Sequence, residues 1–88
     1  LKATEMQAAI GCAQLEKLPG FIKKRIENHD YLCNALKDSG GFTIQNALPD
    51  SKPAWFGFMM TLSENVEYTR NKFARHLEEN NIQTRNLF

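Results

Sequence analysis

The chain has 88 residues, of which 42% are hydrophobic and 24% are charged, an ordinary composition for a globular protein. Its formal net charge is +1, so it lacks the basic excess that draws a domain to nucleic acid or to anionic membranes. The longest nearly apolar run, "AWFGFMMTL", is only as long as a strand and cannot form a membrane helix. We therefore expect a single domain over residues 1–88 with one core, and neither a nucleic-acid nor a membrane partner.

The first predicted element is a helix from about Thr4 to Leu18. Thr4 is a favourable N-cap, and Gln7 stands three residues later, which is the spacing of a capping box. Apolar residues recur at helical spacing along this segment, among small residues that allow another backbone to approach closely. Pro19 and Gly20 then predict the end of the helix and a sharp turn.

A second helix is predicted over about residues 21–39. Its apolar positions repeat at spacings of four, three, four and three, which is typical of a buried helix face. They are Ile22, Ile26, His29, Cys33 and Leu36. Gly40 and Gly41 predict the end of this helix.

The next segments indicate β structure. "FTIQNAL" (42–48) and "WFGFMMTL" (55–62) are predicted strands, separated by the proline-containing loop "PDSKP". In the second strand, Phe56 is expected to share one face with Phe58, Met60 and Leu62, because side chains alternate along a strand.

A third helix is predicted to begin at Ser63 as N-cap and to end at Asn80 and Asn81. Its expected buried residues are Val66, Phe73, Ala74 and Leu77. "IQTRNLF" (82–88) is then a third predicted strand. The order α-α-β-β-α-β predicts an α+β domain with two layers, a small antiparallel or mixed sheet covered by helices.

The residues that most often carry chemistry form no recognisable active site or metal site in this chain. Cys12 and Cys33 lie in predicted helices, without a second ligand two to four positions away, so buried thiols are favoured over metal ligands or a disulfide. His29 and His76 lack a cysteine or carboxylate at the spacing that predicts a metal site, which favours structural roles. No catalytic residue and no metal ligand is therefore predicted here.

Three other residues are candidates for binding. Arg85 stands between apolar residues of the last predicted strand, where an arginine must point outward or meet an anion. Trp55 and Phe56 follow the proline loop and could form a flat apolar wall for a base or a sugar. Plain core packing is the alternative explanation for these two aromatic residues.

The positions of the chain ends indicate a piece of a longer protein. The sequence begins without methionine, almost at a helix start, and it stops at Phe88 inside a predicted strand. Natural domains seldom begin and end so close to the edges of their own elements. We therefore expect residues 1–88 to be one domain of a larger protein.

Three stretches together resemble a known family. "LKATEMQAAIGCAQLEKLPGFIKKR" resembles the segment that opens the C-terminal part of the sugar-nucleotide aminotransferase and dehydrase family, vitamin-B6-dependent enzymes of fold type I. "PAWFGFMMTL" followed by "FARHLEENNIQTRNLF" is similar to its 3-dehydrase branch, which acts on CDP-4-keto-6-deoxyglucose for the dideoxysugars of lipopolysaccharide. The resemblance covers essentially the whole chain and implies the C-terminal small domain of such an enzyme.

The resemblance implies a cytoplasmic, homodimeric parent enzyme that removes the C3 hydroxyl of its sugar with pyridoxamine or pyridoxal phosphate, in the company of a reductase. The position of the catalytic histidine or lysine lies outside these residues, so the fragment alone is expected to be inactive. Some members carry an iron–sulfur cluster, and its presence is undecided because Cys12 and Cys33 do not match its ligands.

The resemblance also suggests roles for five residues. Lys2 and Arg85 are expected to neutralise phosphate on the cofactor or the nucleotide, and Trp55, Phe56 and Phe88 are expected to line the sugar side. Two alternatives stay open: an aminotransferase of the same family, and a free-standing protein-interaction module. The exact sugar and the oligomeric state of the fragment are not predicted.

Overall fold

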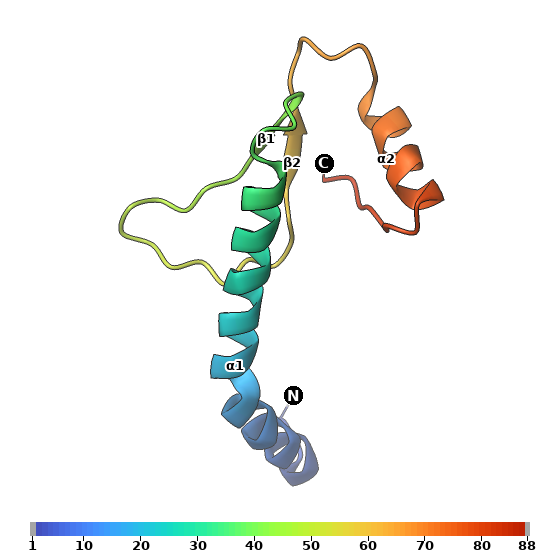
Figure 1. The fold of residues 1–88 in the computed structure, drawn as a ribbon. Helices are drawn as coiled ribbons and strands as arrows, with labels where there is room; N and C mark the ends of the chain where they lie inside the picture. Colours follow the sequence, from blue (N-terminus) through green and yellow to red (C-terminus); the bar gives the residue numbers. More distant parts are fainter. Residues whose placement is uncertain (1, 88) are drawn as a thin grey trace.

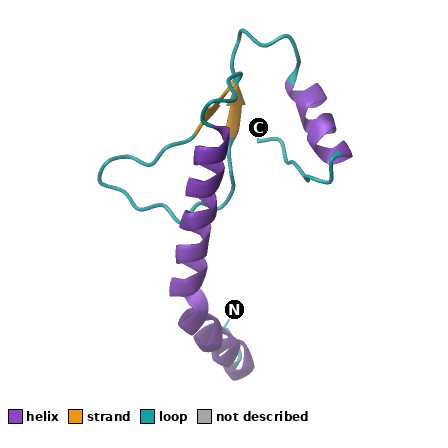
Figure 2. Cartoon of the chain, in the orientation of Figure 1, coloured by secondary structure: helices purple, strands orange, loops and turns teal. Residues whose placement is uncertain are grey.

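The chain was analysed as a computed structural model, which describes residues 2–87. Its elements follow the order α1 (Glu5–Leu36), β1 (Phe42–Ile44), β2 (Met60–Leu62) and α2 (Arg70–Glu79). Figure 1 shows the long α1 beside a small sheet, with α2 beyond it, and Figure 2 shows how much of the chain between them is loop. Helices with a two-stranded antiparallel sheet agree with the α+β prediction.

α1 is one helix and not the predicted two. Its start is as expected, because the Thr4 side chain accepts from the backbone N–H of Gln7, and the Gln7 side chain accepts from the backbone N–H of Thr4. The predicted break at Pro19 and Gly20 is wrong, since Pro19 lies inside the helix. A proline removes one helical hydrogen bond and crowds the preceding turn. The helix nevertheless continues through Pro19 and Gly20 to Leu36, and Figure 1 shows it bent in this region.

The predicted face of the second helix is confirmed as the covered side of α1. Its five residues are half-buried or buried, whereas residues 2–21 are all exposed. The end of α1 also differs slightly from the prediction, because the helix stops at Leu36, three residues before Ser39.

β1 and β2 form a short antiparallel pair. Phe42 faces Leu62, Thr43 faces Thr61 and Ile44 faces Met60. Both strands are three residues long, so the predictions of strands over 42–48 and 55–62 are too long. Phe56, expected on a strand face, lies outside β2 and is 93% exposed.

α2 begins at Arg70 with Thr69 as its N-cap, so the predicted start at Ser63 is wrong. The N–H of Ser63 donates to the carbonyl of Gly41 at 2.9 Å and continues the β1–β2 pairing, and turns and bends follow before α2 begins. The Thr69 side chain instead accepts from the N–H of Lys72 at 3.2 Å. The predicted end is confirmed, since Asn80 is the C-cap.

The third predicted strand is not found in residues 82–87, and Phe88 lies outside the described residues. The chain folds back on the end of α2, because the N–H of Ile82 donates to the carbonyl of Leu77 at 2.9 Å. Thr84 Oγ1 also lies 3.3 Å from Oε1 of Glu78. These contacts with α2 take the place of pairing with a strand.

The expectation of one apolar core is wrong for residues 2–87, among which no hydrophobic residue is fully buried. The molecule measures 54 × 29 × 24 Å, and residues 5–21 of α1 are all exposed. α2 meets the sheet through Phe73, whose ring lies 6.4 Å from that of Phe42 and 5.8 Å from that of Tyr68. The four residues expected to be buried in the third helix are half-buried, although Val66 precedes α2: Val66, Phe73, Ala74 and Leu77.

Large apolar side chains are exposed along the described chain, and exposed apolar patches often mark surfaces that contact a partner. No helix among residues 2–87 is long and apolar enough to cross a membrane. The exposed side chains are Met6, Ile10, Leu15, Leu18, Phe21, Tyr31, Leu32, Leu48, Phe56, Met59, Ile82 and Leu87.

Candidate functional site

His29 is the most enclosed side chain of the described residues, with 7% of its surface exposed. Its ring stacks on Trp55, with centroids 3.8 Å apart and planes 3° from parallel. Phe58 closes a second side, 5.5 Å away and tilted by 59°. The structural role predicted for His29 agrees with this packing. The stack also ties the C-terminal third of α1 to a segment 26 residues later in the chain.

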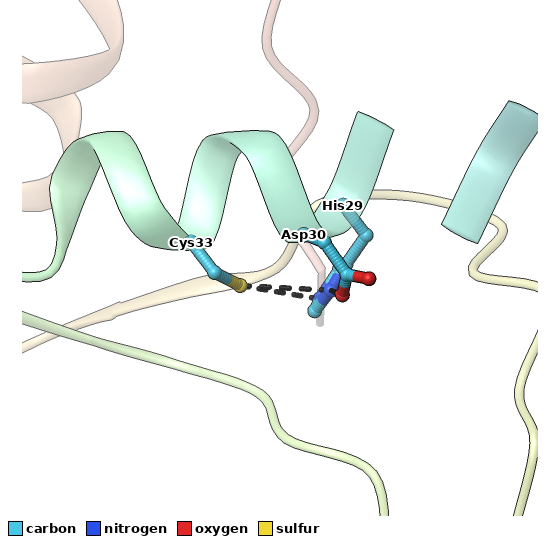
Figure 3. A network of polar contacts seen from close by, with 3 residues as sticks. All are labelled: His29, Asp30 and Cys33. Atoms are coloured by element: carbon cyan, nitrogen blue, oxygen red, sulfur yellow. Dashed lines mark hydrogen bonds and ion pairs between the residues drawn. The ribbon is translucent and has the colours of Figure 1, made fainter. Parts of the chain in front are cut away.

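Cys33 lies one helical turn after His29 and contacts its ring, with Sγ 3.5 Å from Nδ1 (Figure 3). A carboxylate oxygen of Asp30 lies 4.0 Å from the same Nδ1. Burial raises the pKa of the Cys33 thiol, and the negative charge of Asp30 raises it further. A thiol with a raised pKa is a poor nucleophile near neutral pH, so the surroundings of Cys33 favour packing over covalent chemistry.

Trp55 has a backbone φ of 54°, in the left-handed region. For a bulky residue this conformation is uncommon and costs about 1–2 kcal/mol, because Cβ approaches the following carbonyl oxygen. An aromatic pair contributes about 0.5–1.5 kcal/mol beyond the burial of its area, which is similar in size. The stack on His29 therefore offsets the strain at Trp55.

An open hollow of about 420 Å³ lies between α1 and the loop that follows β1. α1 provides one wall with Ile26, His29, Asp30 and Cys33. The loop provides the other, with Asn46, Ala47, Ser51, Lys52, Pro53 and Trp55. One ring of this wall is already stacked on His29, so Trp55 offers less surface to a ligand than the sequence suggested.

The structure separates the other predicted site residues. Lys2 precedes α1 and Arg85 follows α2, both exposed, and the chain ends that carry them lie well apart in Figure 1. Phe56 points away from the packing that holds its neighbour Trp55, while Phe88 lies outside the described residues. Within one chain, Lys2 and Arg85 therefore do not form a common phosphate site.

The described residues do not fit a pyridoxal-phosphate or pyridoxamine-phosphate site. Such a site needs cationic groups converging on the phosphate, and the two proposed cations are separated. A second hollow, of about 300 Å³, lies on α2 and contains Arg75 but no lysine or histidine. Among residues 2–87, no three histidine, cysteine or carboxylate side chains gather in a way that could hold a metal ion.

Only one residue of the His29–Trp55 pair could be placed from the sequence. The helical spacing correctly places His29 on the covered face of α1, between Ile26 and Cys33. The partner ring follows a loop whose path has no local signal, so the stack itself was missed. A proline-flanked tryptophan near an apolar histidine is too weak a pattern to predict a contact.

The sequence model of the DegT/DnrJ/EryC1/StrS aminotransferase family matches residues 1–88, the whole chain. The chain belongs to this family. The resemblance seen in the opening and closing stretches of the sequence is thereby confirmed.

Three relatives cover almost all of the chain. It is 42% identical over 89 residues to the lipopolysaccharide biosynthesis protein RfbH of Salmonella typhimurium, over all of this chain and 20% of the relative. It is 40% identical over 88 residues to a dTDP-4-dehydro-2,6-dideoxy-D-glucose 3-dehydratase of Saccharopolyspora spinosa, over all of this chain and 19% of the relative. A GDP-4-keto-6-deoxy-D-mannose 3-dehydratase of Escherichia coli is 32% identical over 85 residues, 97% of this chain and 21% of the relative.

The chain therefore spans about a fifth of the length of these curated relatives. No solved structure matches it at a significant level. The family assignment thus depends on the sequence, and the α+β arrangement comes from the structure described above.

Proposed function

We propose that this chain is part of a sugar-nucleotide 3-dehydratase, an enzyme that removes the C3 hydroxyl of a nucleotide-linked 4-keto-6-deoxy sugar. The observation that carries the proposal is the match of the entire chain, at 40% identity, to a relative named as such a dehydratase. A second relative with the same type of name, and one named for lipopolysaccharide biosynthesis, support it. The substrate we propose is CDP-4-keto-6-deoxyglucose, for the dideoxysugars of lipopolysaccharide.

In this proposal residues 1–88 are one domain, the C-terminal small domain of a type I pyridoxal-phosphate fold in a cytoplasmic enzyme. Pyridoxamine phosphate supplies the electron sink for the dehydration when it is bound. Because the described residues of one chain do not by themselves fit the cofactor, we propose that other parts of the protein complete its site. The proposed enzyme also works with a reductase, and whether it carries an iron–sulfur cluster stays open.

Lys2 and Arg85 are proposed to neutralise phosphate charge on the cofactor or the nucleotide. Both are exposed, and cations at exposed positions remain available to an anion from outside the chain. Because one chain keeps them apart, a site that uses both requires two subunits, with Lys2 from one and Arg85 from the other. We therefore propose a homodimer whose sites are shared. Trp55, Phe56 and Phe88 are proposed to lie on the sugar side.

The activity is tested with the full-length protein, pyridoxamine phosphate, a reductase and CDP-4-keto-6-deoxyglucose, with the dTDP- and GDP-linked 4-keto sugars in parallel. We expect loss of the C3 oxygen from the CDP-linked sugar. Loss from another nucleotide sugar would correct the substrate and keep the reaction. Amino transfer from glutamate without loss of oxygen would contradict the proposal and assign the protein to the aminotransferases of the family.

The shared site is tested by mixing subunits. Arg85→Ala and Lys2→Ala are each expected to raise the KM for the nucleotide sugar, whereas the exposed Arg75→Ala serves as the matched control. If each site combines Lys2 of one subunit with Arg85 of the other, a mixed dimer of the two variants has one site with both residues intact. Activity recovered on mixing supports the proposal. No recovery would place both residues in one subunit or outside the site.

A further inference from the structure

Trp55 and Phe56 are neighbours in sequence but have opposite surroundings. The Trp55 ring is stacked on His29 and is part of the packing between α1 and the loop. Phe56 is 93% exposed, more than any other large hydrophobic side chain of the described residues. Of these two aromatic residues, Phe56 is the one whose ring the described residues leave almost uncovered.

The direction of Phe56 depends on how Trp55 is held. Trp55 adopts a left-handed φ of 54°, which turns the chain sharply just before Phe56. A tryptophan does not keep this conformation without support, so the surrounding contacts must stabilise it. The support comes from His29, which is 7% exposed and lies in the C-terminal third of the 32-residue α1. Phe58 contacts the same histidine ring from another side.

We infer that His29 is a positioning residue: its stack on Trp55 fixes the turn that presents Phe56, and Phe56 makes the aromatic contact with the sugar side of the nucleotide sugar. This inference rests on the proposed function and refines it, because it assigns the contact to Phe56 and makes Trp55 its support. The aromatic wall suggested by the sequence is thus divided into a ligand-facing ring and a half-buried anchor.

The binding test uses the full-length protein and CDP-4-keto-6-deoxyglucose, measured by calorimetry without added pyridoxamine phosphate so that no turnover occurs. His29→Ala and Phe56→Ala are each expected to weaken binding roughly three- to tenfold, the range of an aromatic contact. The double variant is expected to be no weaker than the weaker single variant, because the two residues act on the same contact. Tyr31→Ala, an exposed aromatic truncation on the same helix, is the matched control and is expected to leave the Kd unchanged.

A conservative replacement separates positioning from mere stability. His29→Phe keeps a flat ring against Trp55 and is expected to restore the parent Kd. In the dehydration assay His29→Ala is expected to raise KM with a change in kcat of less than about twofold, as for lost binding. If His29→Ala does not fold, Trp55→Ala removes the same stack from a half-exposed position and must weaken binding equally.

Acrylamide quenching of tryptophan fluorescence follows the stack independently of activity. The Trp55 signal is the part of the emission that is lost in Trp55→Phe. His29→Ala is expected to increase this quenching, and His29→Phe is not. The inference is overturned if His29→Ala exposes Trp55 but leaves the Kd unchanged, or if the two losses add in the double variant. It is overturned as well if Phe56→Ala binds normally. All these results leave the dehydration assay to decide the proposed function by itself.

Discussion

Two adjacent glycines after α1 allow a prediction in which strain and contact are measured separately. Gly40 and Gly41 have φ angles of 67° and 80°, in the left-handed region. A Cβ on Gly40 would meet no atom within 4 Å. A Cβ on Gly41 would lie 3.0 Å from the Tyr68 hydroxyl and 3.1 Å from Cγ1 of Val66. Alanine at each position therefore introduces the same strain but a different contact.

The magnitudes follow from these angles and distances. Left-handed backbone costs an alanine about 1–2 kcal/mol, and the reduced freedom of the unfolded chain returns about 0.4–1 kcal/mol. We expect Gly40→Ala to lower the free energy of unfolding by about 1 kcal/mol. Gly41→Ala must also displace Tyr68 and Val66 by a few tenths of an ångström, and we expect a loss of about 2 kcal/mol. The carbonyl of Gly41 accepts from Ser63, so this strain acts directly on the sheet.

The assay is urea unfolding monitored by circular dichroism. The variants are compared with one common slope of the free energy of unfolding against urea concentration. Gly11→Ala is the control of opposite sign, because Gly11 lies inside α1 with nothing within 4 Å of an added Cβ. It should stabilise the chain by about 0.5–1 kcal/mol through helix propensity. Equal losses for Gly40→Ala and Gly41→Ala would refute the contact with Tyr68 and Val66. A neutral Gly41→Ala would refute the left-handed conformation itself.

Three further predictions concern α1 and α2. Thr69→Ala should destabilise α2 by about 1 kcal/mol, measured by the same unfolding assay, because it removes the acceptor for the N–H of Lys72, whereas Thr69→Ser should not. Pro19→Ala should raise the helix signal and straighten α1, and an unchanged spectrum would contradict a continuous helix through this position. Because the raised pKa of Cys33 favours the protonated thiol in the folded state, the free energy of unfolding should fall as pH rises above the ordinary value of 9.0. Cys33→Ala should remove that fall and the exposed Cys12→Ala should not, as unfolding titrations would show.

The features that the sequence predicted correctly depend on residues close together in the chain. The capping box of Thr4 and Gln7 joins residues three apart. The covered face of α1 repeats over single helical turns, from Ile22 to Leu36, and the end of α2 at Asn80 is a local signal too. Family membership was also readable, because it is carried by the order of side chains along the chain.

The features that were mispredicted depend on distant partners. Ser63 has the sequence of an N-cap, but it lies at the end of the sheet, bonded to Gly41 22 residues earlier, and α2 begins only after Thr69. The strands are short because pairing, and not β propensity, sets their length. Trp55 and Phe56 were expected to form one aromatic wall. Instead, the Trp55 ring stacks on His29 and the Phe56 ring stays exposed. The sequence by itself determined the helical faces, the caps and the family. Only the tertiary structure decided which side chains meet, because those contacts depend on the path of the loops between the elements.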